Sequence, residues 1–349
     1  DDRFGDRLRL STGSPAIERF TGPQIRKFAR ENPGAYHGTA VVHLVSSFCC
    51  SVLCGVSAPI DYGDGAGMNL LNLETLAWDS EIAAFTAPGL LGKLPDVVPS
   101  NTVAGGLSSY FEKYGLKAGI PVAVWSGDNP NSLVGTGVAE PGTAVVSLGT
   151  SDTFFASMRD FRTDPEGYGN VFGNPAGGFM SLICFTNGSL AREAVRKACG
   201  LSYEEFDRVT PVPAEERLML PYFSPESTPL VLKPGVKYDF DPSQADGPAR
   251  VRALLESQTL SMRLHSAWQG LTLRRIRVTG GASRSPLLRR IIADVFQAEV
   301  ETVAVSNSAG LGAALRAANA VDGVAFPELF RRFCRPVETL PADPSAAPR

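Results

Sequence analysis

The segment from residue 276 to residue 320 alternates between strand and helix patterns, and this alternation most constrains the fold. IRVTGG (276–281) is a strand-like run that ends in two glycines, and PLLRRIIADVF (286–296) follows with its apolar residues on one helical face. A second strand pattern, VETVAV (300–305), and a helix of small residues, SAGLGAALRAANA (308–320), come next. Alternating strands and helices joined by short glycine turns indicate an α/β protein.

The rest of the chain gives several further elements and a domain boundary. The patterns predict helices over 22–33, 43–55 and 250–269, a buried strand over 121–126, a loop leading into a strand pair over 61–73 and a β-hairpin over 143–157. A length of 349 residues favours two domains. Because the composition changes near Gly135–Pro141, we expect a first domain over 1–138, a second over 139–335 and a flexible tail over 336–349.

The charge balance excludes several classes of partner. The 33 basic and 36 acidic residues form no basic block, which argues against binding to nucleic acid or to a membrane surface. No run reaches the roughly 20 apolar residues of a membrane span, and the charged first residues are unlike a signal peptide. The six cysteines are too sparse for a disulfide framework. We therefore expect a reduced, cytoplasmic protein.

One acidic residue is placed where α/β proteins bind ligands. The chain lacks the GxxxxGK[ST], HExxH, GxSxG and GxGxxG motifs, and its three histidines are scattered. Asp128 follows the end of a predicted strand and opens a predicted helix. It could simply cap that helix, or it could act as a general base at the carboxyl edge of the sheet. Asn129 beside it could bind a polyol.

Two glycine-rich turns could approach phosphate groups or a flat base. Gly149, Thr150 and Ser151 form the predicted hairpin turn, which offers backbone N–H groups and two hydroxyls, although a hairpin also needs glycine for its own geometry. Gly280 and Gly281 lie between a strand and a helix, where small residues admit a ligand to the backbone. Each turn on its own is common in proteins. The two turns together, in this order after the acid Asp128, are not common.

This combination resembles the FGGY carbohydrate kinases, and among them the eukaryotic xylulose kinases. The resemblance covers roughly residues 10 to 335, and the stretches that carry it are ERFTGPQI (18–25), LVSSF (44–48), PIDYGDGAGMNLLNL (59–73), GDNPNSL (127–133), VSLGTSDT (146–153), NGSLARE (187–193) and VTGGASRSPLL (278–288). It implies the two-lobed actin/hexokinase-like (ribonuclease H-like) ATPase fold. The activity it implies is the Mg²⁺- and ATP-dependent phosphorylation of D-xylulose to D-xylulose 5-phosphate.

The resemblance also implies a role for each candidate residue. Asp128 would be the general base, and Arg19 and Asn129 would contact the sugar. Gly149, Thr150 and Ser151 would form a phosphate loop, while Gly280 and Gly281 would border the adenosine. Ser285 stands where the family often has an asparagine near the nucleotide. No residue is assigned to the metal.

Nothing in the chain matches the family's N-terminal DxGTxxxR phosphate loop, so we expect a fragment with an incomplete first lobe and little activity of its own. A kinase for another sugar or polyol, such as ribulose or glycerol, is one alternative. A truncated, non-catalytic binding protein is another. The oligomeric state has no signature in the sequence.

Overall fold

The computed structural model describes residues 5–209, 217–305 and 307–346 and divides the chain into two compact units. Each unit is assembled from three separate segments. The first unit contains residues 1–139, 157–180 and 305–334, and the second contains residues 140–156, 181–304 and 335–349.

The largest sheet has seven strands, most of which belong to the second unit. Their order is β15 (Pro336–Leu340), β14 (Glu299–Val303), β13 (Arg275–Thr279), β7 (Thr143–Leu148), β8 (Asp152–Met158), β10 (Phe179–Phe185) and β9 (Asn170–Gly173). β13 runs parallel to both β7 and β14, whereas β8 and β15 are antiparallel to their neighbours β7 and β14. Because β7 and β13 are parallel, the loops that follow them leave the same edge of the sheet.

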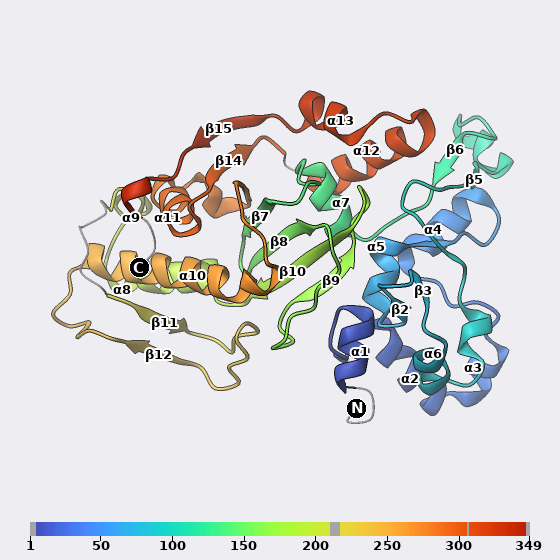
Figure 1. Cartoon of the computed structure of the whole chain (residues 1–349), viewed down its shortest axis with the longest axis horizontal. Coiled ribbons are helices and arrows are strands. Elements are labelled where there is room, and N and C mark those ends of the chain that lie inside the picture. Colours follow the sequence, from blue (N-terminus) through green and yellow to red (C-terminus); the bar gives the residue numbers. More distant parts are fainter. Residues whose placement is uncertain (1–4, 210–216, 306, 347–349) are drawn as a thin grey trace. The chain divides into compact units, whose positions relative to one another are not determined.

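Helices of the second unit pack on this sheet. They are α8 (Ser189–Ala198), α9 (Tyr203–Asp207), α10 (Gly247–Ser266) and α11 (Pro286–Phe296). The apolar face of α11 is buried through residues such as Leu288 and Ile292, and Phe296 at its end stacks on Phe154 of β8 with ring centres 5.6 Å apart. A hairpin of β11 (Met219–Tyr222) and β12 (Gly235–Tyr238) lies beside α10 (Figure 1).

The first unit is mostly helical. Its helices are α1 (Gly5–Thr12), α2 (Thr21–Glu31), α3 (Pro33–Gly38), α4 (Val45–Cys54), α5 (Tyr62–Gly65), α6 (Ser80–Thr86), α7 (Asp128–Gly135), α12 (Ser308–Asp322) and α13 (Phe326–Phe333). Its short strands are β1 (Ile60–Asp61), β2 (Leu71–Asn72), β3 (Ala77–Trp78), β4 (Val97–Val98), β5 (Val103–Gly106) and β6 (Pro121–Ala123). α12 lies directly alongside α7 (Figure 1).

The helices expected over 22–33, 43–55, 250–269 and 286–296 are present as α2, α4, α10 and α11, which confirms those predictions. The hairpin over 143–157 is also confirmed, as β7 and β8. The strand expected over 121–126 is shorter, because only residues 121–123 pair, with β5.

Two expectations about the organisation of the chain need correction. The tail was expected to be flexible from residue 336, but residues 336–340 form β15, which pairs with the sheet edge at β14; residues 347–349 lie outside the described part. The boundary expected at 138/139 falls at 139/140, yet the units are not consecutive in sequence, because residues 305–334 pack within the first unit.

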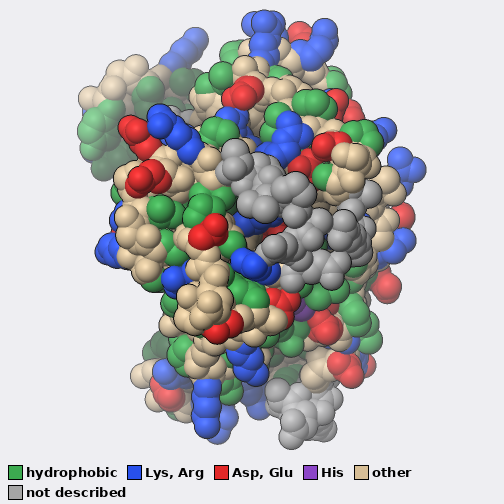
Figure 2. Space-filling model, turned by 90° about the vertical axis from the view of Figure 1, so that its left-hand side faces the viewer, with side chains coloured by type: hydrophobic (Ala, Val, Ile, Leu, Met, Phe, Trp, Pro, Cys, Tyr) green, Lys and Arg blue, Asp and Glu red, His purple; other side chains and the backbone are tan. Residues whose placement is uncertain are grey.

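The surface carries both signs of charge. On the face shown in Figure 2, basic and acidic side chains are interspersed. None of the six cysteines, all of which lie in the described part of the chain, forms a disulfide. In the part of the chain that the structure describes, no helix combines the length and the apolar character that crossing a membrane requires.

Candidate functional site

Asp128 is the first residue of α7 and its side chain is exposed. The helix cap is Gly127 and not Asp128, so the capping interpretation of this acid is wrong. The only hydrogen bond described for its carboxylate is local, from the N–H of Asn129 to Oδ1 at 2.7 Å. The start of a helix favours a negative charge, and the fold leaves the Asp128 side chain accessible at this point.

A second carboxylate, Asp64, lies against the backbone that precedes Asp128. Its Oδ1 is 2.9 Å from the position that a Cβ on Gly127 would take, so a larger residue at 127 would make the Asp64 side chain move. The Ser46 hydroxyl donates to Oδ2 of Asp64. Burial raises the pKa of Asp64 to about 6; the charges of Asp61 and Asp128 add to this rise, while the Ser46 hydrogen bond and the Arg316 charge oppose it. Asp64 and Asp128 therefore lie close together but differ in environment.

Sequence reasoning assigned no role to Asp64. The signal available was the pair Asp61 and Asp64 in PIDYGDGAG, which contributed only to the resemblance. Neither acid stands at a position that periodicity singles out. Asp61 caps α5 by accepting the N–H of Asp64 at 2.8 Å, a local bond that turns the chain so that Asp64 reaches Gly127.

The two expected sugar contacts belong to the same unit as Asp128. Arg19 is exposed in the turn before α2, and no hydrogen bond or ion pair of its side chain is described. Asn129 is half-buried in the first turn of α7. The structure therefore places Asn129 beside Asp128 and leaves Arg19 available, but no described bond joins Arg19 to either residue.

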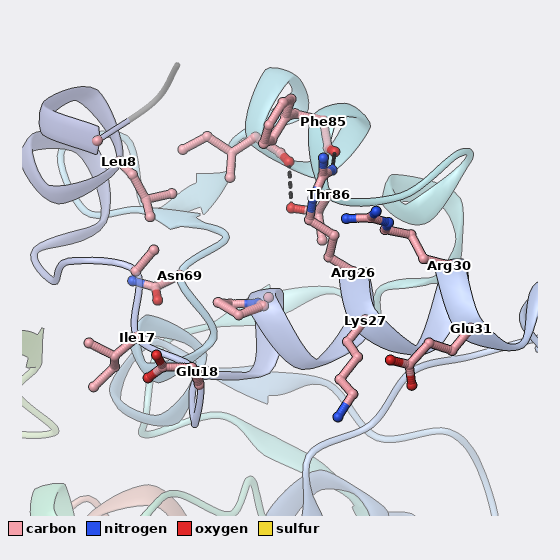
Figure 3. A pocket seen from close by; sticks show the side chains of 15 residues that line it. Leu8, Ile17, Glu18, Arg26, Lys27, Arg30, Glu31, Asn69, Phe85 and Thr86 are labelled. Atoms are coloured by element: carbon pink, nitrogen blue, oxygen red, sulfur yellow. Dashed lines mark hydrogen bonds between the residues drawn. The ribbon is translucent and has the colours of Figure 1, made fainter. Parts of the chain in front are cut away.

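A cavity of about 630 Å³ lies beside the segment that contains Ile17 and Glu18 (Figure 3). Ile17 and Glu18 line it on one side and α2 lines it on another. Arg26 of α2 donates to the carbonyl of Phe85, and its guanidinium carbon lies 4.3 Å from the centre of the Phe85 ring. Asp128 does not line this cavity, so the cavity and the exposed acid are separate features of the first unit.

In the second unit, Gly149, Thr150 and Ser151 form a three-residue loop between β7 and β8. Leu148 pairs with Asp152, which leaves only these three residues outside the ladder. The side chains of Thr150 and Ser151 are exposed. Two hydroxyls are therefore carried by exposed residues at the sheet edge, an arrangement suited to phosphate oxygens.

Gly280 brings the second glycine turn against this loop. It has a φ of 85°, and a Cβ on it would lie 2.4 Å from the carbonyl oxygen of Leu148, immediately before Gly149. Only glycine fits such a contact. Gly281 is exposed, with nothing within 4 Å of the position of a Cβ. The structure thus joins the two predicted nucleotide turns at one edge of the sheet.

Ser285 has a structural task in this turn. It is buried and caps α11, since its hydroxyl accepts the N–H of Leu288 at 3.3 Å. The hydroxyl of Ser283 is also engaged, because it donates to the carbonyl of Gly280 at 2.7 Å. The turn is therefore held by its own hydroxyls, and the backbone around Gly280 and Gly281 stays open.

A buried polar network supports the Gly149–Ser151 loop. Arg192 of α8 binds both oxygens of Asp152, at 2.7 and 2.8 Å, and donates to Gln258 at 3.1 Å. Burial raises the pKa of Asp152, and the hydrogen bonds and charge of Arg192 oppose that rise. Gly188 allows the turn before α8 to touch the loop, because its Cβ position is 2.7 Å from the Thr150 carbonyl. Sequence reasoning missed this support, although NGSLARE was among the stretches it noted.

The geometry fits a nucleotide better than it fits a metal bound by protein ligands alone. Thr150, Ser151, Gly280 and Gly281 are exposed, and turns of this kind can be approached by phosphate groups and by a flat base. Among the residues for which a structure is described, no group of three or more His, Cys, Asp and Glu side chains could hold a metal ion.

Comparison with known proteins gives the same picture for both units. Residues 2–135 match the N-terminal domain of the FGGY family of carbohydrate kinases, and residues 144–321 match its C-terminal domain. The chain is 38% identical to xylulose kinase 2 of Arabidopsis thaliana over 91% of its length and 37% identical to xylulose kinase of Rattus norvegicus over 97%. It spans 61% and 66% of the lengths of these relatives.

A solved structure agrees with these matches. A xylulose kinase from Brucella ovis superposes with a TM-score of 0.85 over 98% of this chain and 72% of that one, at 25% identity. The expected actin/hexokinase-like fold is therefore confirmed.

Proposed function

Because the chain belongs to the FGGY family of carbohydrate kinases, we propose that it takes part in the ATP-dependent phosphorylation of D-xylulose to D-xylulose 5-phosphate. The choice of sugar is supported by the relatives named xylulose kinase in a plant and a mammal. The observation that carries the chemistry is the exposed Asp128 carboxylate at the start of α7, in a fold whose second unit presents two open glycine turns.

In this proposal Asp128 is the general base. It accepts the proton of the sugar hydroxyl, whose oxygen forms a bond to the γ-phosphorus while the bond from that phosphorus to the β–γ bridging oxygen breaks. The products are ADP and the sugar phosphate, and the proton resides on Asp128. Phosphoryl transfer of this kind depends on positioning and charge neutralisation more than on covalent chemistry.

The other candidate residues bind the reactants. Arg19 and Asn129 contact the sugar, and an unpaired guanidinium and a half-buried amide are suitable donors for its hydroxyls. Thr150, Ser151 and the backbone of Gly149 contact phosphate oxygens. Gly280 and Gly281 lie along the adenosine, and Ser285 shapes that turn by capping α11. Mg²⁺ carried by the triphosphate would neutralise its charge, and no residue of this chain is assigned to it.

The proposal includes a cytoplasmic location and a place in xylose metabolism. Six free thiols support a reducing compartment, where disulfides are rare. The interspersed surface charges suit a protein whose partners are small molecules, without nucleic acid or a membrane surface.

The test measures ADP release from ATP·Mg²⁺ with and without D-xylulose, beside calorimetric binding of each ligand. Because nothing in the chain matches the family's first phosphate loop, we expect slow sugar-dependent release, and Asp128→Asn should lower its rate by about 10²- to 10⁴-fold without weakening nucleotide binding. A panel of D-xylulose, ribulose and glycerol separates a xylulose kinase from its relatives. Binding of nucleotide and sugar without turnover would favour a binding protein, and a variant that keeps more than about a tenth of the activity would remove Asp128 from the role of base.

A further inference from the structure

α12 comes from the C-terminal part of the chain, yet it packs backbone to backbone on the helix that begins with Asp128. A Cβ on Gly312 would lie 1.8 Å from the carbonyl oxygen of Asn131, and a Cβ on Gly135 would lie 1.8 Å from that of Ser308. No side chain therefore fits at position 135 or at position 312. The hydroxyls of Ser132 and Ser308 are 3.2 Å apart at the same crossing. Such contact leaves α7 no freedom to shift without moving α12.

One turn beyond Gly312, α12 sends Arg316 into the first unit. This side chain is 3% exposed. Its Nη1 donates to the Asn131 side-chain oxygen at 3.0 Å, and its Nη2 donates to the carbonyls of Ser100 at 2.9 Å and Val124 at 3.2 Å. Val124 lies four residues before Asp128, and Asn131 lies three residues after it within α7. The guanidinium therefore binds a backbone carbonyl on one side of the acid and a side-chain amide on the other.

Arg316 also places a positive charge close to two further acids of the first unit, Asp61 and Asp64. Its Nη2 is 3.4 Å from Oδ2 of Asp61, which is fully buried and accepts a hydrogen bond from Ser100 at 2.6 Å. Asp61 in turn positions Asp64 through the bond to the Asp64 N–H. Without a positive partner, the buried Asp61 carboxylate would strongly destabilise the folded protein. Arg316 therefore connects the two buried acids with α7.

We propose that Arg316 is the positioning residue of the catalytic segment: it fixes Val124 and Asn131 on either side of Asp128 and balances the carboxylates of Asp61 and Asp64, so that Asp128 points at the sugar hydroxyl. This inference rests on the proposed function for the role of Asp128, but the positioning itself is a property of the fold. A planar, forked donor is needed, because lysine could face Asp61 but could not also reach Asn131 and both carbonyls.

The test uses two variants with one control in the full chain. Arg316→Lys keeps the charge and loses the fork, and Asn131→Ala removes the contact to α7 while leaving Arg316 in place. Arg332→Gln is the control, since it removes an arginine of the same unit whose side chain is 62% exposed. Each protein is examined by thermal unfolding, by amide hydrogen exchange and by the kinetics of ADP release.

We expect both test variants to lower kcat by about 10- to 100-fold while the KM for ATP is unchanged, because a small displacement of a catalytic group acts on the chemical step. Amides of residues 128–135 should exchange faster, and those of α11 should not. The double variant should lose no more than the worse single variant, since both act on one contact. The control should match the parent protein.

Two outcomes overturn the inference. One is unchanged exchange over residues 128–135 in Arg316→Lys. The other is a kcat that falls only in proportion to the loss of folded protein. If the parent protein phosphorylates no sugar in the panel, the proposed function fails separately, and the exchange comparison still decides whether Arg316 holds α7.

Discussion

The guanidinium of Arg192 binds both carboxylate oxygens of Asp152, at 2.7 and 2.8 Å, where Asp152 is the first residue after the Gly149–Ser151 loop. Both side chains are almost fully buried. The same guanidinium lies 3.1 Å from the hydroxyl of Ser189. A buried charge pair therefore supports the loop from inside the second unit. A ligand would bind the opposite, exposed side of the loop.

Loss of this pair should destabilise the second unit. Arg192→Ala leaves the Asp152 carboxylate buried without a partner, so we expect the free energy of unfolding to fall by about 3–5 kcal/mol. Urea denaturation measures this change. Lys197→Ala on the same helix is the control, because that side chain is 69% exposed and its loss should leave stability unchanged. Equal effects of the two substitutions would show that the pair contributes nothing specific.

Gly280 and Gly281 should respond very differently to the same substitution. Gly280→Ala forces a Cβ against the Leu148 carbonyl at a positive φ, so we expect a loss of about 1–3 kcal/mol in stability together with weaker nucleotide binding. Gly281→Ala meets nothing within 4 Å and should fold normally. Calorimetry with a non-hydrolysable ATP analogue, beside thermal unfolding, measures both effects. If Gly281→Ala alone weakens binding, the ligand approaches at Gly281 and the crowding at Gly280 is purely structural.

The helix crossing in the first unit should tolerate no methyl group. Gly135→Ala places a Cβ 1.8 Å from the Ser308 carbonyl, and the helices must separate, which we expect to cost about 1–3 kcal/mol or more. Gly34→Ala in α3 meets nothing within 4 Å and should be neutral or stabilising. Chemical denaturation of both variants is the measurement. A fully stable Gly135→Ala protein would mean that α7 and α12 are not in backbone contact in solution.

Asp64 should make stability depend on pH. Its pKa is raised from 3.8 to about 6, so the folded protein holds a proton that the unfolded chain releases between these values. The contribution of Asp64 to the free energy of unfolding is therefore greatest below about pH 4. This contribution is lost as the pH rises through 6, and the loss is at most about 3 kcal/mol.

Asp64→Asn removes this dependence, because the amide stays neutral. We expect the variant to gain stability relative to the parent protein as the pH rises from 4.5 to 7.5, and urea denaturation at both values measures it. Parallel pH profiles for the two proteins would contradict a raised pKa at Asp64.

Local patterns in the sequence predict the elements whose stability is local. The sequence predicts α11 because its apolar residues recur on one face, and the structure buries that face. β7 and β8 were predicted because a short glycine-containing turn joins two strand-like runs. The glycine turns at 149 and 280 were chosen for the same reason, and their meeting follows from the parallel pairing of β7 with β13.

The features that depend on distant partners could not be read in this way. β15 lies in a tail rich in proline and alanine, a composition typical of a loose end, and it becomes a strand only because β14 offers an unpaired edge. The contact of Gly135 with α12 joins residues that no local pattern relates. Asp64 acquires its unusual environment from Gly127, Ser46 and Arg316, which come from three separate parts of the chain. Packing, and not propensity, decides these features.

The division of each unit into three separate segments has a consequence for how the protein is made. A ribosome releases the chain from its N-terminus, so α7 emerges long before α12 has been synthesised. Until then the glycine side of α7 has no helix against it, and the carboxylates of Asp61 and Asp64 have no guanidinium. The first unit therefore cannot reach its final form during synthesis of its own N-terminal segment, and it is completed only after α12 has been made.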